Sequence, residues 1–225
     1  LHKIKKLKPN LNIDIYYLNN LKFSVGFLSS TFYSSPSKFL NIIAITGTNG
    51  KTTIAMAGAN IFANTNGKAG VIGTLGVSYF EKKGNKIIEE KIANTGLTTP
   101  SAISIHKYLK FFLHKKINDI FIEASSIGIV QGRLIGCYIK TAIFTNLGHD
   151  HLDFHGNLEN LARAKALLFS SFGLEKVVCL REKKDDNFLN ELIYKEISKV
   201  ENKIYVEVNP ENLKFLNGVI LRSFL

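Results

Sequence analysis

The sequence lacks the features of several protein classes. It has no tryptophan and only two cysteines among 225 residues, and no apolar run approaches the roughly 20 residues that a membrane span needs. Its basic start is not followed by the apolar segment of a secretory signal. Cys137 and Cys179 match no CxxC pattern, so we interpret them as free thiols of a reducing compartment. These absences predict a cytoplasmic protein with no membrane partner.

The composition also limits the class of partner. Apolar residues make up 45% and charged residues 21% of the chain, which is typical of a globular fold and excludes a mainly disordered chain. The net charge of +11 indicates an anionic partner, such as a nucleic acid or a phosphorylated small molecule. The one dense basic cluster is Lys3, Lys5, Lys6 and Lys8. Because no aromatic and basic RNA-binding signature accompanies it, we expect most lysines to be solvated and predict no nucleic-acid partner.

Apolar periodicity predicts alternating strands and helices. The strands are expected at residues 39–45, 71–77, 120–124, 140–147, 176–180 and 203–208, and a hairpin at 77–80 and 86–91. The helices are expected at residues 52–64, 99–115, 157–172 and 186–199, with helical spacing also at 21–32. Thr99 is the expected N-cap of the second of these helices, with Pro100 in its first turn. This alternation predicts an α/β fold with a mostly parallel sheet flanked by helices, plus a small β-hairpin.

A candidate phosphate loop joins the first strand to the first helix. Residues 45–53 read ITGTNGKTT. Glycines let backbone N–H groups approach phosphate oxygens, and the helix N-terminus adds partial positive charge. Lys51 can neutralise the β and γ phosphates, and Thr52 can offer its hydroxyl to Mg²⁺. The string departs from GxxxxGK[ST] because Ile45 stands where the first glycine is expected, and the alternative is an ordinary glycine-rich turn with a solvated lysine.

Lys165 is out of place on the expected helix 157–172. Its spacing puts it on the stripe formed by Leu158, Leu161, Ala162, Leu168 and Phe169. Burying an ammonium group costs roughly several kcal/mol unless it is paired or neutralised. Lys165 is therefore either a lysine that snorkels at the edge of the stripe or a charge-paired or chemically changed lysine that faces an active site.

Acids and histidines gather after the strand 140–147, at an edge where open α/β sheets place ligand sites. Four of them alternate along the chain: His149, His151, Asp153 and His155. An extended chain would put these side chains on one side. Mg²⁺ with few protein ligands suits a phosphate-loop protein better than zinc, and a polar surface loop is the alternative. Glu123, which ends another apolar strand, is a further candidate Mg²⁺ ligand.

Five ordered motifs resemble those of the Mur ligase family. They read ITGTNGKTT (45–53), LTTP (97–100), EASSIGIVQGRL (123–134), FTNLGHDHLDFHG (144–156) and ARAKALLF (162–169). Within the family they are most similar to the UDP-N-acetylmuramoyl-tripeptide synthetases, or MurE-type ligases. The string GTNGKTT differs from that of the folylpolyglutamate branch, and VQGR followed by DHLDFHG differs from the other Mur ligases.

The resemblance implies an ATP-dependent and Mg²⁺-dependent ligase of peptidoglycan precursor synthesis. ATP would phosphorylate the terminal carboxylate of UDP-N-acetylmuramoyl-L-alanyl-D-glutamate. The amine of a diamino acid, meso-diaminopimelate or L-lysine, would then attack the acyl phosphate through a tetrahedral intermediate and form a peptide bond. These two molecules are the partners that the resemblance implies.

The resemblance also assigns roles to individual residues. ATP would be held by Gly47, Thr48, Asn49, Gly50, Lys51, Thr52 and Thr53. Mg²⁺ would be bound by Thr52 and Glu123, and a second Mg²⁺ by His151. The UDP-sugar peptide would be gripped by Thr98, Thr99, Ser125, Gln131 and Arg133. Lys165 matches a lysine that is carbamylated by CO₂, which would explain its apolar surroundings, and Lys51 and Lys165 would be the catalytic residues.

The sequence departs from the family pattern in two motifs and in extent. Ile127 replaces the histidine of SSHG, and Gly148-His149 replaces the usual pair before DHLD. We expect residues 1–38 to be a remnant of the N-terminal uridine-binding domain, 39–225 to be an incomplete central ATP-binding domain, and the C-terminal ligase domain, with its DNPR-type motif, to be absent. The chain is then either part of an active ligase, such as a split gene whose other half is supplied separately, or a non-catalytic remnant that at most binds nucleotide. A basic nucleic-acid-binding module with a P-loop is the third alternative.

Overall fold

The computed structural model describes residues 20–180, 188–198 and 204–208. Its strands form one sheet in the order β4-β3-β2-β5-β1-β6-β7-β8. They are β1 (Asn41–Thr46), β2 (Lys68–Gly73), β3 (Gly76–Lys83), β4 (Lys86–Ala93), β5 (Asp119–Glu123), β6 (Thr141–Phe144), β7 (Lys176–Leu180) and β8 (Ile204–Val208). All pairs are parallel except β2–β3 and β3–β4, which confirms the expected mostly parallel sheet.

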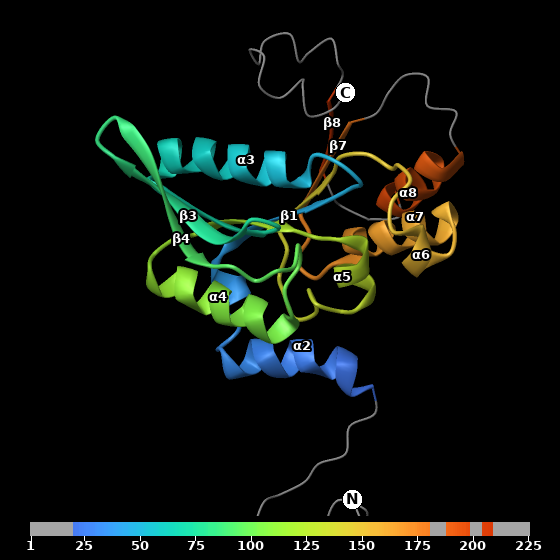
Figure 1. Cartoon of the computed structure of the whole chain (residues 1–225), viewed down its shortest axis with the longest axis horizontal. Coiled ribbons are helices and arrows are strands. Elements are labelled where there is room, and N and C mark those ends of the chain that lie inside the picture. The colour runs from blue at the N-terminus through green and yellow to red at the C-terminus, as the bar shows by residue number, and fades with distance from the viewer. Residues whose placement is uncertain (1–19, 181–187, 199–203, 209–225) are drawn as a thin grey trace, which may run out of the picture.

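Helices cover both faces of the sheet. They are α2 (Leu21–Phe32), α3 (Lys51–Asn66), α4 (Ala102–His114), α5 (Ser126–Val130), α6 (Leu152–His155), α7 (Leu158–Ala166) and α8 (Phe188–Ser198), with short 3₁₀ turns η1 (Pro36–Phe39) and η2 (Leu167–Ser170). Figure 1 shows α3 on one face and α4 and α5 on the other. Because both faces are covered, β1 and β5 are continuous apolar runs rather than alternating ones.

The core is divided by the sheet into two apolar clusters. Ile43 and Ile45 of β1 pack toward the α3 side, with Ala55 and Ala59. Ile42 and Ala44 belong to the larger cluster, which also includes Leu109 of α4. Adjacent strand residues point to opposite faces, so each face of β1 contributes to a different cluster.

Helix α2 lies against the same body of structure as the sheet. Gly26 allows close packing, because a Cβ there would lie 2.5 Å from the Ile135 carbonyl oxygen. The Ser30 hydroxyl donates to the Gly136 carbonyl oxygen at 3.1 Å. The expected domain boundary at residue 38 stays a prediction, but the segment from α2 to η1 packs directly against α4 and the 135–136 loop.

The segment 71–77, expected as one strand, is split between two strands. Strand β2 ends at Gly73, the chain turns through Thr74 and Leu75, and β3 begins at Gly76, which has a φ of +103°. Gly73 pairs with Gly76 in an antiparallel ladder. Apolar periodicity did not predict this turn, because a turn is usually recognised by a run of polar residues. Here the glycines on both sides allow the chain to turn without such a run. The hairpin β3–β4 is confirmed, but it extends the main sheet and is not a separate small element.

Two expected helices and one strand differ in extent. Helix α4 is capped by Ser101, whose side chain accepts from the Ser104 amide at 3.2 Å, and not by Thr99. The expected helix 157–172 begins correctly after its N-cap Asn157, but η2 follows it from Leu167. The strand expected at 140–147 is limited to Thr141–Phe144, because the chain then turns toward the phosphate loop.

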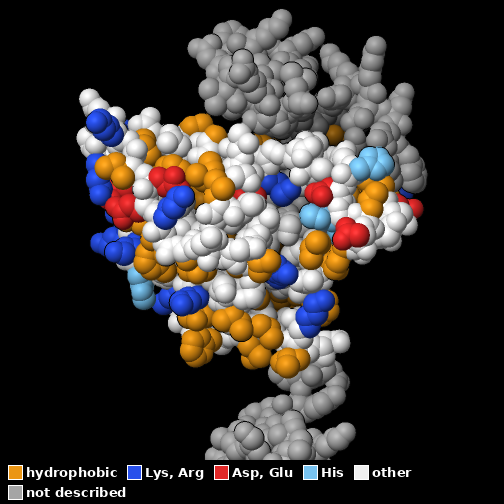
Figure 2. Space-filling model, in the orientation of Figure 1, with side chains coloured by type: hydrophobic (Ala, Val, Ile, Leu, Met, Phe, Trp, Pro, Cys, Tyr) orange, Lys and Arg blue, Asp and Glu red, His pale blue; other side chains and the backbone are white. Residues whose placement is uncertain are grey.

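The surface has scattered charge and one apolar area. On the face in Figure 2, lysine and arginine side chains are dispersed, whereas apolar side chains gather over α2. Five large apolar side chains of α2 are exposed: Leu21, Phe23, Phe27, Leu28 and Phe32. None of the described helices is long and apolar enough to cross a bilayer. The basic cluster at residues 3–8 lies outside the described residues.

Candidate functional site

The loop between β1 and α3 is tied to the residues that follow β6. Gly47 has a φ of +146°, and a Cβ there would lie 1.8 Å from the Thr145 hydroxyl oxygen. That hydroxyl donates to the Asn49 carbonyl oxygen at 2.6 Å, and the Asn49 amide donates to the Asn146 side chain at 3.0 Å. Only glycine suits position 47, because the backbone is left-handed and Thr145 occupies the space.

The missing first glycine also has a structural reason. Ile45 is fully buried in β1 and pairs with Glu123 of β5, so the turn starts two residues later at Gly47. Gly50, with a φ of +82°, precedes the first turn of α3. Thr48 is anchored to Gly148 by two hydrogen bonds, of 2.9 and 3.1 Å, and Thr53 is exposed. The strand–loop–helix arrangement predicted for phosphate binding is therefore present.

Lys51 folds back into this loop. Its Nζ donates to the carbonyl oxygens of Gly47 and Thr48, each at 2.8 Å. Burial lowers the pKa of Lys51, and the nearby Glu123 and Asp150 oppose that shift. A cation is thus held against the concave side of the loop, next to the helix end that favours anions.

Glu123 is a buried carboxylate with several donors. Its Oε2 accepts from the Thr52 hydroxyl at 2.9 Å and from the Thr74 hydroxyl at 3.0 Å, and its Oε1 accepts from the Thr74 amide at 3.0 Å. The Thr74 hydroxyl oxygen also lies 3.0 Å from the Thr98 hydroxyl oxygen. Gly73 makes room, because a Cβ there would lie 2.1 Å from Oε1. The two predicted Mg²⁺ ligands Thr52 and Glu123 therefore meet.

The residues predicted to grip a UDP-sugar peptide form one network beside Glu123. The Thr99 hydroxyl donates to the Glu123 carbonyl oxygen at 2.7 Å, lies 3.0 Å from the Ser125 hydroxyl, and accepts from the Ser125 amide at 2.9 Å. Arg133 donates through Nη1 to the Thr99 carbonyl oxygen at 2.5 Å and through Nη2 to the Gln131 side chain at 2.5 Å. Thr99 thus connects the carboxylate site to the Arg133 guanidinium.

Lys165 on α7 is only 1% exposed, so the snorkelling alternative is wrong. Burial, and to a smaller extent the charge of Lys51, lower its pKa to about 7, and Asp150 opposes this shift. Within the described ranges, no hydrogen bond or ion pair involves its Nζ. Because the charge of Lys51 lowers the pKa of Lys165, the two side chains lie near each other, and a large share of Lys165 is the neutral amine near pH 7.

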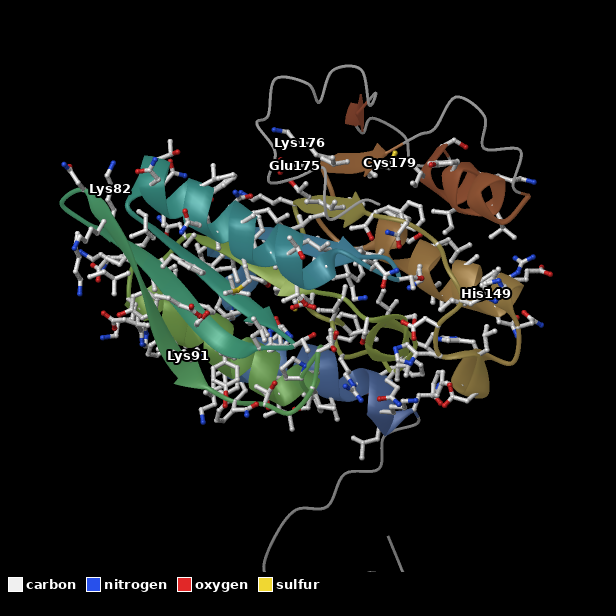
Figure 3. The ribbon with its side chains drawn as sticks, turned by 45° about the horizontal axis from the view of Figure 1, so that its top comes forward. Lys82, Lys91, His149, Glu175, Lys176 and Cys179 are labelled. Atoms are coloured by element: carbon white, nitrogen blue, oxygen red, sulfur yellow. The ribbon has the colours of Figure 1, made fainter. Side chains whose placement is uncertain are left out.

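The histidine segment is not extended, so the expected alternation is wrong. His151 has a φ of +49° and precedes α6, which turns the chain. His149 and His151 are exposed, and His155 is buried. His151 Nε2 lies 3.4 Å from Asp150 Oδ2. Figure 3 shows His149 beside α6 and α7, at the end of the molecule opposite Lys82 on the hairpin.

Among the residues that the structure describes, no group of three or more histidine, cysteine and acidic side chains is arranged to hold a metal ion. The sequence prediction missed Asp150, which faces both site lysines, and Thr74, which holds Glu123. Asp150 could have been identified from the sequence, because it directly precedes the predicted ligand His151. Thr74 could not have been identified from the sequence, because its hydrogen bonds to Glu123 depend on β2 and β5 being neighbouring strands.

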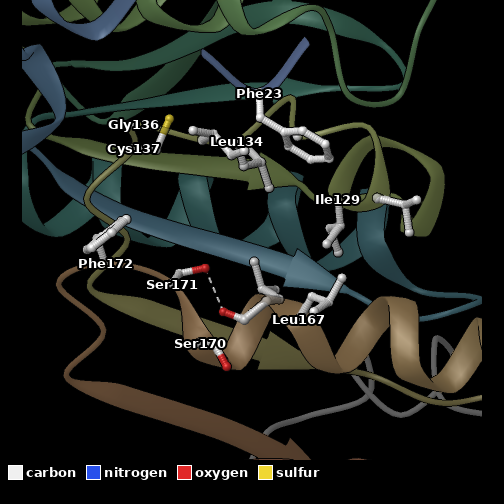
Figure 4. A pocket seen from close by; sticks show the side chains of 13 residues that line it. Phe23, Ile129, Leu134, Gly136, Cys137, Leu167, Ser170, Ser171 and Phe172 are labelled. Atoms are coloured by element: carbon white, nitrogen blue, oxygen red, sulfur yellow. Dashed lines mark hydrogen bonds between the residues drawn. The ribbon is translucent and has the colours of Figure 1, made fainter. Parts of the chain in front are cut away.

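A separate apolar cavity of about 460 Å³ lies between α2, the segment after α5 and the region of η2 (Figure 4). Phe23, Leu134, Cys137, Leu167 and Phe172 are among its lining residues. None of the residues predicted to bind ATP, Mg²⁺ or substrate lines it.

Comparisons with known proteins show which family this chain is similar to. The model of the Mur ligase middle domain matches residues 45–218. UDP-N-acetylmuramoyl-L-alanyl-D-glutamate–2,6-diaminopimelate ligase from Wigglesworthia glossinidia brevipalpis is 38% identical over 203 residues, covering 90% of this chain and 38% of that protein. The ligase of the same name from Listeria monocytogenes serovar 1/2a is 34% identical over 170 residues, covering 76% of this chain and 33% of that protein.

Solved structures agree with the sequence comparisons. A UDP-N-acetylmuramoyl-L-alanyl-D-glutamate–2,6-diaminopimelate ligase aligns with a TM-score of 0.70 and 30% identity, over 86% of this chain and 37% of that one. The MurF ligase from Thermotoga maritima in complex with ADP shares the fold, with a TM-score of 0.52 and 18% identity over 87% of this chain and 39% of that one. The chain thus spans less than two fifths of the curated relatives cited. Because the family model covers most of its length, the chain belongs to the Mur ligase family.

Proposed function

We propose that the chain forms the ATP-binding middle domain of a MurE-type ligase, which joins 2,6-diaminopimelate to UDP-N-acetylmuramoyl-L-alanyl-D-glutamate. The observation that supports this most is the meeting of the Lys51 loop, the Thr52–Glu123 pair and buried Lys165 at one end of the sheet, beside the Thr99 network. The names of the similar ligases favour diaminopimelate over L-lysine as the added diamino acid.

The residues fit a nucleotide phosphate and a divalent cation. Gly47–Thr53 would surround the phosphates, since Gly47 and Gly50 open the loop and Lys51 supplies a cation. Thr52 and Glu123 would bind Mg²⁺ with hard oxygen ligands, and His151 is the proposed ligand of a second Mg²⁺. When bound, Mg²⁺ would neutralise phosphate charge at the site of acyl-phosphate formation.

A substrate site and a carbamylation site are proposed next to the phosphate and Mg²⁺ site. Thr98, Thr99, Ser125, Gln131 and Arg133 would bind the muramoyl dipeptide. Lys165 would react with CO₂ to form a carbamate. Its nitrogen bonds to the carbon of CO₂, and the proton it loses passes to solvent. Such a carbamate is an anion, and it would be stabilised by the neighbouring Lys51 cation. The cytoplasmic location and a separately supplied C-terminal half stay predictions.

Saturation-transfer NMR with Mg·AMPPCP and with the UDP-muramoyl dipeptide tests this function. The wild-type chain is expected to bind both molecules. Arg133→Ala is expected to lose the dipeptide signals, because the cation nearest Thr99 is removed, and to keep the nucleotide signals. Lys107→Ala, at an exposed position of α4, is the matched control and should retain both. Absence of nucleotide binding, or dipeptide binding unchanged by Arg133→Ala, contradicts the proposal.

Gly73→Ala tests the proposed Mg²⁺ site. The new Cβ would lie 2.1 Å from Glu123 Oε1, so the carboxylate must move away from the Thr74 amide. We expect the gain in AMPPCP affinity on adding Mg²⁺ to fall roughly tenfold, the size of one lost hydrogen bond to a charged group. Gly148→Ala is the control, since its Cβ would meet Thr48 Cγ2 at an ordinary 3.4 Å. An unchanged Mg²⁺ effect in Gly73→Ala, measured by calorimetry, argues against this site.

A further inference from the structure

His155 joins the loop before α7 to the start of α5. The residue is 8% exposed, and its Nε2 lies 2.9 Å from the Ser126 hydroxyl oxygen. Ser126 is 1% exposed and is the first residue of α5. The preceding residue, Ser125, caps α5 and contacts Thr99. A single buried hydrogen bond therefore links the histidine segment to the network beside Glu123.

The backbone of His155 is held from the other side by α7. Asn160 Nδ2 donates to the His155 carbonyl oxygen at 2.9 Å, and the Asn160 amide donates to the side chain of the N-cap Asn157 at 2.8 Å. The same helix carries Lys165. His155 thus has fixed contacts to α5 through its ring and to α7 through its backbone, and it lies where these two helices pack together.

The charged groups that face His155 include Lys165. Burial lowers the pKa of His155, and the charges of Lys165 and His151 lower it further; Asp153 and Asp150 oppose this. The ring is therefore neutral near pH 7 and can share one proton with the Ser126 hydroxyl. A neutral, hydrogen-bonded ring beside Lys165 adds no charge to its surroundings and excludes water from this side.

We propose that His155 is a positioning residue for Lys165: its hydrogen bond to Ser126 keeps α5 against the α6–α7 segment and so keeps the Lys165 amine in a dry pocket where it reacts with CO₂. This inference rests on the proposed carbamylation of Lys165. Opening the contact would admit water, which favours the ammonium form. Because an ammonium nitrogen has no free electron pair for CO₂, less carbamate would form.

The test is ¹³C NMR of the full chain equilibrated with ¹³C-bicarbonate. Wild type is expected to show one carbamate resonance, and Lys165→Arg none. His155→Phe and Ser126→Ala each remove the hydrogen bond and should reduce the carbamate fraction about fivefold at equal bicarbonate, the effect of one net hydrogen bond. His155→Gln can still bond to Ser126 and should restore most of the signal. His149→Phe, at an exposed position, is the matched control.

The outcomes separate this inference from the proposed carbamylation. No resonance in wild type contradicts carbamylation itself. A wild-type resonance that is equally strong in Ser126→Ala overturns the role of His155, and so does a loss in His155→Phe that His155→Gln fails to restore. Ser126→Ala removes only a hydroxyl group, so a result can be obtained even if the larger His155→Phe change prevents folding.

Discussion

Lys51→Ala is expected to weaken binding of Mg·AMPPCP by about a hundredfold or more. The Lys51 ammonium already lies inside the loop, 2.8 Å from two carbonyl oxygens. Hydrogen bonds to charged groups contribute about 1.5–3 kcal/mol each, and two such contacts to phosphate oxygens account for a loss of this size. The loss is also larger at a partly buried site, where solvent screens charge less.

The measurement is isothermal titration calorimetry of the wild-type chain and three variants. Lys51→Arg keeps the charge but not the shape of the contact, so an intermediate affinity is expected. Lys107→Ala removes an exposed lysine of α4, on the opposite face of the sheet from α3, and should leave the Kd unchanged. If Lys51→Ala binds within twofold of wild type, the loop does not hold the phosphates and the proposed function fails.

Lys165→Met is expected to stabilise the fold by about 2–4 kcal/mol at pH 7 in CO₂-depleted buffer. Burial holds the Lys165 pKa at about 7, against 10.5 for the ordinary side chain. Each unit of such a shift corresponds to about 1.4 kcal/mol of stability. Methionine fills a similar volume without a charge, and replacing a buried charge with an apolar group is commonly stabilising.

The pH dependence identifies the cause of this stabilisation. Between about pH 7 and 10.5 the unfolded chain binds the Lys165 proton and the folded chain does not, so this group makes stability rise with pH. The penalty is fully present below about pH 7 and is gone above 10.5. The advantage of Lys165→Met should therefore shrink from pH 7 to pH 10 in urea unfolding.

Two further measurements control that experiment. Lys107→Met, at an exposed position, should change stability little at either pH. Bicarbonate should stabilise wild type but not Lys165→Met, because a ligand that reacts only with the folded state stabilises it by mass action. An advantage of Lys165→Met that is equal at pH 7 and pH 10 would show that packing, and not the lysine charge, is responsible.

If this prediction holds, the lysine is kept at a cost in stability. A buried amine that destabilises the fold is expected only where the amine has a use. The proposed use is the carbamate beside Lys51, and the two lysine variants together test it. Lys51→Ala reports on the phosphate side of the site, and Lys165→Met reports on the side formed by α7.

Local pattern was sufficient for the phosphate loop and for the place of Lys165. The strand–glycine–helix order of residues 45–53 depends only on neighbours in sequence, and the structure has it in β1 and α3. The apolar spacing around Lys165 likewise placed it on the apolar stripe of α7, and the structure then showed that it is buried there. In contrast, apolar periodicity could not predict the turns at Thr74 and His151. Each of these turns depends on the positive φ of one residue, Gly76 or His151, and a single residue leaves no periodic pattern.

By itself the sequence determined the α/β class, the strand–loop–helix order around residues 45–53 and the apolar stripe that carries Lys165, since these follow from spacing along one segment. That Lys165 is buried rather than snorkelling was decided by the tertiary structure. Only the tertiary structure decided which side chains meet: Glu123 with Thr52 and Thr74, Arg133 with Thr99, and His155 with Ser126. These contacts depend on the strand order β2-β5-β1-β6 and on the packing of α5 against α7. That arrangement joins residues far apart in the chain, and no local pattern encodes it.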